Sequence, residues 1–180
     1  MVTIARSEWV SQDVMSHILA ALTPENRLAI TVSLLTGLRI GDVLNIRTRQ
    51  LSTERLTVIE EKTLKRRTVR LPDKLREQLI SYAGKIYVFP NRLDPRRHRT
   101  RQAVYKDIKR AAKAFRVHIN ITPHSARKCY AVAEYRRDFN AARVQRLLNH
   151  SSEAVTMIYA IADELTARQH KKRAPQLGGS

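Results

Sequence analysis

Helical periodicity runs through most of this 180-residue sequence and is interrupted once by a short stretch rich in β-branched residues. Thr23-Pro24-Glu25 and Thr122-Pro123 each place a capping residue before a proline, which is typical of a helix start. Residues 56–59 and 68–71 flank a basic segment and are typical of two strands joined by a turn. The pattern predicts a mainly α fold with a small antiparallel β-sheet, in the α+β class.

The expected elements follow from capping residues and apolar spacing. Ser7 is a candidate cap for a first helix whose apolar positions run from Val10 to Leu22, and Gly37 is expected to end the second helix. Further helices are expected at about 40–46, 73–82, 100–115, 124–136 and 141–148. We expect a single domain over residues 1–180, with its core at about 7–160 and a C-terminal tail at 161–180.

The charge is strongly positive and unevenly distributed. The chain has a formal net charge of +18, and residues 1–61 contribute none of the excess, because they hold six basic and seven acidic residues. Two basic runs follow, at 62–76 and 96–116. Such an excess indicates a polyanionic partner, most simply nucleic acid.

Several classes of protein are excluded by composition. A single cysteine, Cys129, rules out a disulfide framework and a cysteine-rich zinc site, and Cys129, His124 and His150 lack metal-ligand spacing. No apolar run approaches the roughly 20 residues that span a bilayer, and the first residues lack the apolar stretch of a signal peptide. We therefore expect no metal, no membrane association and a cytoplasmic protein.

Six polar positions stand out, most of them at helix ends or in the predicted turn. Arg39 follows the glycine that ends a helix, Lys62 lies near the turn of the hairpin, and His124 and Arg127 can face one side of a helix start. His150 lies at another helix boundary, and Tyr159 follows nine residues later. Taken singly, each residue has an ordinary structural explanation, as a cap, a surface charge or a core tyrosine.

Taken in order, the same residues resemble the catalytic domain of the tyrosine recombinases, the phage integrase family. The family pattern is an arginine in a T-G-L-R turn, a lysine on a β-hairpin, an H-x-x-R motif, a second histidine after a leucine-rich helix end, and a tyrosine nine residues beyond it. The matching segments are Thr36-Gly37-Leu38-Arg39, Glu61-Lys62-Thr63, His124-Ser125-Ala126-Arg127, Leu147-Leu148-Asn149-His150 and Thr156-Met157-Ile158-Tyr159.

The resemblance covers roughly residues 23–159 and has two departures. Asn149 stands where the family usually has glycine, and asparagine tolerates a left-handed backbone better than most residues. Larger members also carry a separate DNA-clamping domain before the T-G-L-R region, whereas 22 residues precede Thr23 here. The chain is therefore similar to the compact members or to an isolated catalytic domain.

The resemblance implies a role for each matching residue. Arg39 and Arg127 would grip the non-bridging oxygens of a DNA phosphodiester, with His150 as a third donor. Tyr159 would be the nucleophile, and His124 would accept its proton or orient the phenol. Lys62 would protonate the leaving 5′ oxygen, with Lys65 as the alternative. Asp42 would support Arg39 or its turn.

The implied product is a 3′-phosphotyrosyl enzyme, formed without metal or nucleotide cofactor. The resemblance implies a site-specific recombinase that acts on double-stranded DNA as a tetramer in the nucleoid. Accessory DNA-bending proteins would be optional helpers, and the C-terminal tail would be passed between subunits. A type IB topoisomerase-like nicking-closing enzyme and a non-catalytic DNA-binding regulator are the alternatives. The residues expected to contact DNA are Lys65, Arg66, Arg67, Arg96, Arg97, Arg99, Arg101, Lys106, Lys109, Arg110 and Lys113.

Overall fold

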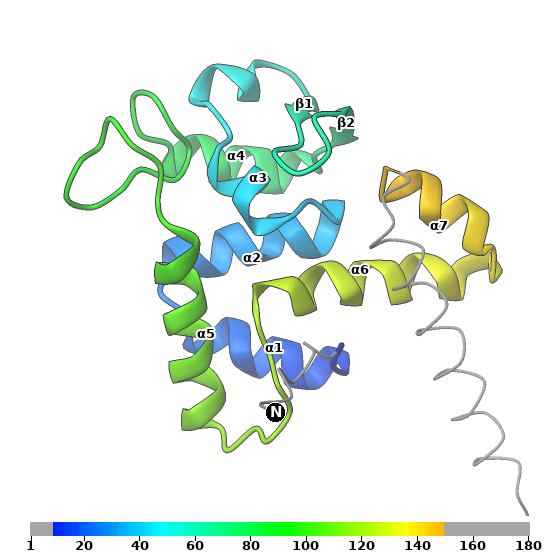
Figure 1. Cartoon of the computed structure of the whole chain (residues 1–180). Coiled ribbons are helices and arrows are strands. Elements are labelled where there is room, and N and C mark those ends of the chain that lie inside the picture. Colours follow the sequence, from blue (N-terminus) through cyan, green and yellow to red (C-terminus); the bar gives the residue numbers. More distant parts are fainter. Residues whose placement is uncertain (1–8, 150–180) are drawn as a thin grey trace, which may run out of the picture.

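The computed structural model describes residues 9–149, and helices dominate this part of the chain. In chain order the elements are α1 (Gln12–Ala21), α2 (Pro24–Thr36), α3 (Ile40–Leu44), the short 3-10 helix η1 (Thr48–Ser52), β1 (Arg55–Ile59), β2 (Arg66–Arg70), α4 (Asp73–Tyr82), α5 (Arg101–Ala114), α6 (Pro123–Asp138) and α7 (Ala141–Leu147). Helices with one two-stranded antiparallel sheet confirm the predicted fold class (Figure 1).

The first helix begins later than the sequence pattern predicted. Ser7 lies outside the described residues, and the cap of α1 is Ser11, whose hydroxyl accepts the N–H of Val14 at 3.4 Å. Val10, which was expected on the helix, precedes it and is buried beside the helices. The start moves because Ser11 offers the same capping oxygen, while Trp9 and Val10 bury their side chains as an extended lead-in.

The end of α2 positions everything that follows. Gly37 has φ +66°, and its N–H donates to the carbonyl of Ser33 at 2.8 Å, which closes the helix as predicted. The ring of Tyr130, on α6, covers this glycine so closely that an added Cβ would lie 2.4 Å from Tyr130 Cδ1. The helices α2 and α6 therefore lie side by side at this point, and Arg39 begins its own helix two residues later (Figure 1).

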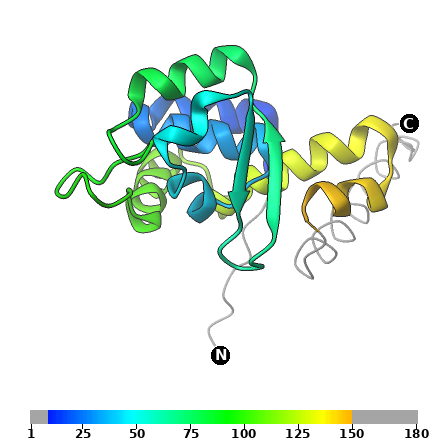
Figure 2. The same ribbon diagram turned by 90° about the horizontal axis from the view of Figure 1, so that it is seen from above.

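The hairpin lies over α2 and α3 (Figures 1 and 2). Its register places Val58 opposite Arg67, and the Glu60 N–H donates to the carbonyl of Lys65 at 3.0 Å across the turn. Leu56, Val58 and Glu60 are all buried, so the strand directs one face inward and continues this alternation one residue past its end. Glu60, the third of these residues, is a buried carboxylate, so its charge requires positively charged partners inside the fold.

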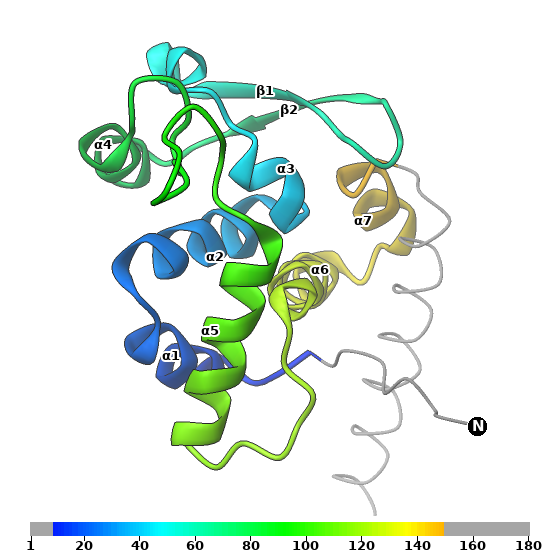
Figure 3. The same ribbon diagram turned by 60° about the vertical axis from the view of Figure 1, so that its left-hand side comes forward.

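The helix α5 is attached to the start of α2 by a buried carboxylate. Asp107 accepts the backbone N–H of Thr23 at 2.9 Å and the amide of Asn26 at 2.7 Å, so the Thr23-Pro24 start is held by a distant helix as well as by its own sequence. Figure 3 shows α5 crossing in front of the other helices, with α1 and α2 on one side and α6 on the other. The main hydrophobic core fills the space between these elements.

Candidate active site

Arg39 is held at the junction of α3 and the hairpin. It occupies the N-cap position of α3, where its backbone is extended, and only 14% of its side chain is exposed. Its Nη1 donates to Oε2 of Glu60 at 2.9 Å. The predicted arginine of the T-G-L-R turn is therefore oriented by a buried carboxylate from the end of β1.

Arg127 is fully buried and joins three segments of the chain. It lies on the second turn of α6, and its Nη1 donates to the carbonyl of Gly37. Its Nη2 donates to the carbonyl of Leu148 at 3.2 Å, two residues before His150. The H-x-x-R segment, the T-G-L-R turn and the end of α7 thus meet at one guanidinium.

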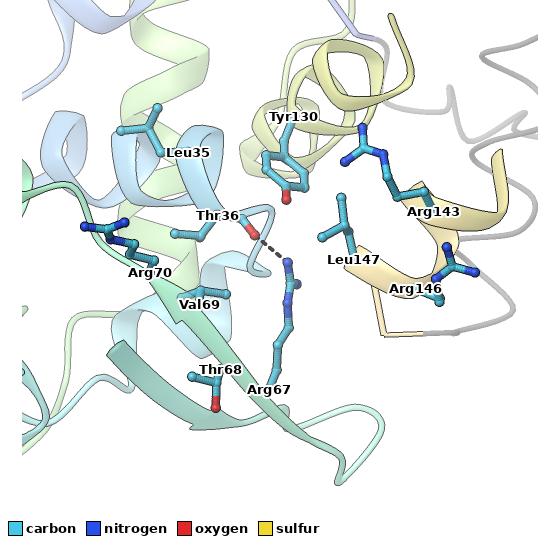
Figure 4. A pocket seen from close by; sticks show the side chains of 10 residues that line it. All are labelled: Leu35, Thr36, Arg67, Thr68, Val69, Arg70, Tyr130, Arg143, Arg146 and Leu147. Carbon is cyan, nitrogen blue, oxygen red and sulfur yellow. Dashed lines mark hydrogen bonds between the residues drawn. The ribbon is translucent and has the colours of Figure 1, made fainter. Parts of the chain in front are cut away.

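Arg67 corrects the DNA-contact prediction made for it. Its side chain is only 8% exposed, and it points from β2 toward the end of α2, as Figure 4 shows. The guanidinium donates to the carbonyls of Thr36 and Gly37 and to Oε1 of Glu60, the last at 3.4 Å. Arg67 is therefore an internal support of the T-G-L-R turn, because its position on β2 faces inward opposite Val58.

Glu60 is the negative charge at the centre of this cluster. Burial alone would raise the pKa of its carboxyl, but the Thr63 hydroxyl and the charges of Arg127, Arg39 and Arg67 outweigh burial and hold the pKa below its ordinary value. The carboxylate is therefore ionised. Burial also lowers the pKa of Arg67, although the nearby Tyr130 and Glu60 act in the opposite direction and raise it.

Asp42 supports the hairpin turn, whereas the sequence prediction assigned it to Arg39 or to the turn that carries Arg39. Its Oδ1 accepts the N–H of Glu61 at 2.9 Å, which fixes the residue before Lys62. The carboxyl is buried, and burial raises its pKa against the opposing effect of that hydrogen bond. Asp42 therefore ties α3 to the first residue of the turn.

The predicted proton-transfer residues lie in two elements, the hairpin turn and the start of α6. Lys62 is exposed in the turn between β1 and β2, as its sequence position indicated, and Lys65 is exposed three residues further on. His124 is half-buried on the first turn of α6, where its N–H donates to the Thr122 hydroxyl at 3.2 Å within a capping box. His150 and Tyr159 lie outside the described residues.

Two more of the residues predicted to contact DNA have hydrogen-bond partners within the fold. Arg99 is half-buried, and its Nε donates to Asn26 at 2.6 Å. Arg110 is more exposed, but its guanidinium binds Asp107 at 2.6 Å and the carbonyl of Ala21. Asp107 pairs directly with Arg110, whereas Arg99 binds Asn26, whose amide donates to Asp107.

The remaining predicted contact residues lie at the surface. Lys109 is half-buried and donates to Asn120 at 2.6 Å, whereas the others are exposed. The exposed members are Lys65, Arg66, Arg96, Arg97, Arg101, Lys106 and Lys113. They belong to the hairpin turn, the loop before α5 and α5 itself.

The sequence prediction missed Glu60, Tyr130 and the inward role of Arg67. The period of two through Leu56 and Val58 placed Glu60 on a buried face, and this was the signal that could have identified it. Tyr130 and Arg67 also line an open pocket of about 400 Å³ between β2, α2, α6 and α7 (Figure 4). A contact between α6 and β2 had no local signal in the sequence.

Metal-binding clusters and membrane-spanning helices are both absent from residues 9–149. In this part of the chain no group of three or more histidine, cysteine, aspartate or glutamate residues is arranged to hold a metal ion. No helix within the same range is both long and apolar enough to cross a membrane.

The chain belongs to the phage integrase family, whose family model matches residues 8–165. It is 32% identical over 168 residues to a tyrosine recombinase of Thermosipho africanus, an alignment that covers 87% of this chain and 58% of that protein. It is 30% identical over 138 residues to the probable integrase/recombinase YoeC of Bacillus subtilis, covering 74% of this chain and 75% of that one. The chain thus spans little more than half the length of the first relative.

Solved structures share the fold. A lambda integrase dimer bound to a COC′ core site aligns with a TM-score of 0.71 at 20% identity, over 89% of this chain and 49% of that chain. The catalytic domain of bacteriophage HP1 integrase aligns with a TM-score of 0.64 at 17% identity, over 97% of this chain and 99% of that domain. The fold is that of a tyrosine recombinase catalytic domain.

Proposed function

We propose that this chain is the catalytic domain of a site-specific DNA recombinase that cuts and rejoins strands through a tyrosine. The observation that carries the proposal is the meeting of the T-G-L-R turn, the hairpin and the H-x-x-R helix around Glu60 and Arg127. Clustered guanidiniums of this kind suit a phosphodiester, whose non-bridging oxygens gain charge as phosphorus becomes five-coordinate. The whole of residues 1–180 would act as one domain.

In the proposed reaction, the phenolic oxygen of Tyr159 bonds to phosphorus while the bond from phosphorus to the 5′ oxygen breaks. His124 takes the phenol proton, and Lys62 or Lys65 gives a proton to the departing 5′ oxygen. Arg39, Arg127 and His150 stabilise the pentacoordinate charge. The free energy of the phosphoester is kept in the 3′-phosphotyrosyl bond, so a new 5′ hydroxyl can attack it without metal or nucleotide.

We infer that the exposed cations of α5 follow the DNA backbone. Lys106→Gln and Lys113→Gln are each expected to weaken binding to all duplexes alike and to flatten the slope of log K against log salt by about 0.9. The measurement is fluorescence anisotropy with two unrelated labelled duplexes over a salt series. Lys74→Gln, which removes an exposed lysine from α4, is the control and should leave the slope unchanged. A loss confined to one of the two duplexes contradicts a backbone role.

Strand exchange is what separates a recombinase from a type IB topoisomerase-like enzyme. A plasmid with two copies of the selected target site should give inverted or excised circles, whereas relaxed circles alone would favour the nicking-closing alternative. Binding without any covalent product would favour a non-catalytic regulator. The solved lambda integrase tetramer is bound to a Holliday junction. We propose that this chain also forms a tetramer on DNA, in the cytoplasm at the nucleoid. Accessory DNA-bending proteins would be optional helpers, and the tail at 161–180 would be exchanged between subunits.

A further inference from the structure

The carboxylate of Glu60 links both the side chain and the backbone of the T-G-L-R turn. It is fully buried, and its Oε2 accepts Arg39 Nη1 and the Thr63 hydroxyl, each at 2.9 Å. Its Oε1 meets Nη1 of Arg67 at 3.4 Å. The network therefore reaches Arg39 directly and reaches the residues before it through Arg67.

The backbone side of this network is carried by two arginines. Arg67 donates to the carbonyls of Thr36 and Gly37, and Arg127 donates to the carbonyl of Gly37 as well. The guanidiniums of Arg39 and Arg67 thus contact the Glu60 carboxylate, and the charge of Arg127 also acts on it. Without that negative charge they would repel one another within a buried site, where a charge lacking a counter-charge is costly.

We propose that Glu60 is a positioning residue that sets the guanidinium of Arg39 before DNA arrives, a proposal that rests on the function proposed above. Its charge holds the arginines together, and its bond to Nη1 fixes the direction in which Arg39 reaches out. A displacement of about 1 Å in such a group can cost about 10²-fold in rate. Affinity, which depends on many exposed cations, is set elsewhere.

Glu60→Gln tests this proposal, because glutamine keeps the size of the side chain and one acceptor oxygen but removes the charge. We expect covalent adduct formation on a nicked duplex to slow about 10- to 100-fold, while the dissociation constant for the duplex changes less than twofold. Glu61→Gln is the matched control: its carboxylate is the next along the chain, is 66% exposed and pairs with Arg101 at 3.6 Å. Equal rates for Glu60→Gln and the unmodified chain would overturn the proposal.

A neutral substrate separates positioning from a general structural role. Replacing one non-bridging oxygen at the cleaved phosphate by a methyl group removes the charge that Arg39 would stabilise. The rate defect of Glu60→Gln should shrink to less than about threefold on this methylphosphonate. An undiminished defect would overturn the proposal. Glu60→Asp, which keeps the charge on a shorter side chain, should recover part of the rate on the ordinary phosphate, and it serves in place of Glu60→Gln if the glutamine variant fails to fold.

A measurement without DNA keeps this proposal separate from the proposed function. In a ¹⁵N spectrum of arginine side chains, the Arg39 guanidinium signal, assigned with Arg39→Lys, should exchange its protons at least tenfold faster in Glu60→Gln than in the unmodified chain. Glu61→Gln should leave it unchanged. If the unmodified chain forms no adduct, the recombinase proposal fails, and this spectrum still decides whether Glu60 holds Arg39. An Arg39 signal unaffected by Glu60→Gln would overturn the inference.

Discussion

Replacing Arg127 by alanine is expected to abolish strand cleavage and to destabilise the fold by about 3 kcal/mol or more. The substitution leaves the carbonyls of Gly37 and Leu148 without their donors, and each unsatisfied carbonyl costs about 1–3 kcal/mol. It also leaves a cavity at a fully buried position. Thermal unfolding followed by circular dichroism measures the stability. Arg70→Ala is the control, because Arg70 is 76% exposed and pairs only at the surface with Glu54.

Arg127→Lys separates the structural and catalytic parts of this effect. Lysine keeps the stem and one positive charge, but a single ammonium cannot replace the guanidinium that bridges Gly37 and Leu148. The folded variant should cleave about 10²- to 10³-fold more slowly, the usual cost of removing one donor to a developing oxyanion. Cleavage by Arg127→Lys at the rate of the unmodified chain would contradict the role proposed for Arg127.

Replacing Gly37 by alanine should be the second large effect, with a loss of about 2–4 kcal/mol in the free energy of unfolding. A left-handed backbone costs an L-residue about 1–2 kcal/mol, and the new Cβ would lie 2.4 Å from Tyr130 Cδ1, a clash worth about 1–3 kcal/mol. Urea unfolding measures the loss. In a chain that already carries Tyr130→Ala, Gly37→Ala should lower the free energy of unfolding by less than it does in the unmodified chain.

Gly41→Ala is the control for this comparison. Gly41 lies in α3, does not have the positive φ of Gly37, and its added Cβ would meet only the outer atoms of the Glu61 and Arg101 side chains. Alanine there should be tolerated within about 1 kcal/mol. A Gly37→Ala variant as stable as Gly41→Ala would contradict the packing of Tyr130 on the T-G-L-R turn.

The sequence predicted the helices and the hairpin well because their signals are local. Thr122-Pro123 starts α6 with a capping box, and Gly37 ends α2 in the left-handed conformation. Asn149, which replaces the usual glycine, adopts φ +65°, so the tolerance predicted for asparagine is confirmed. The prediction of Ser7 as the first cap was wrong. Ser11 has the same capping hydroxyl, and the choice between the two serines depends on the burial of Val10, which is a tertiary contact.

The supporting charges of the site could not be predicted because they depend on contacts between distant elements. A basic run at 62–76 gives no sign that Arg67 turns inward while Arg66 and Lys65 face outward, until the strand register places Arg67 opposite Val58. Arg99 and Arg110 were assigned to DNA for the same reason, and their bonds to Asn26 and Asp107 had no local signal in the sequence. The ordered motif residues could be predicted, whereas their counter-charges could not.

The proposed nucleophile gives the most direct test of the central claim. A pool of nicked duplexes with a randomised central sequence lets the short strand released by cleavage diffuse away, so a covalent intermediate is trapped. The protein is incubated with this pool, denatured in detergent and separated on a gel. We expect an adduct with a blocked 3′ end on its DNA and a 5′ hydroxyl on the released strand, absent in Tyr159→Phe and retained in Tyr82→Phe, an exposed tyrosine on α4. An adduct that persists in Tyr159→Phe, or the absence of any adduct from the unmodified chain across the pool, would contradict the account.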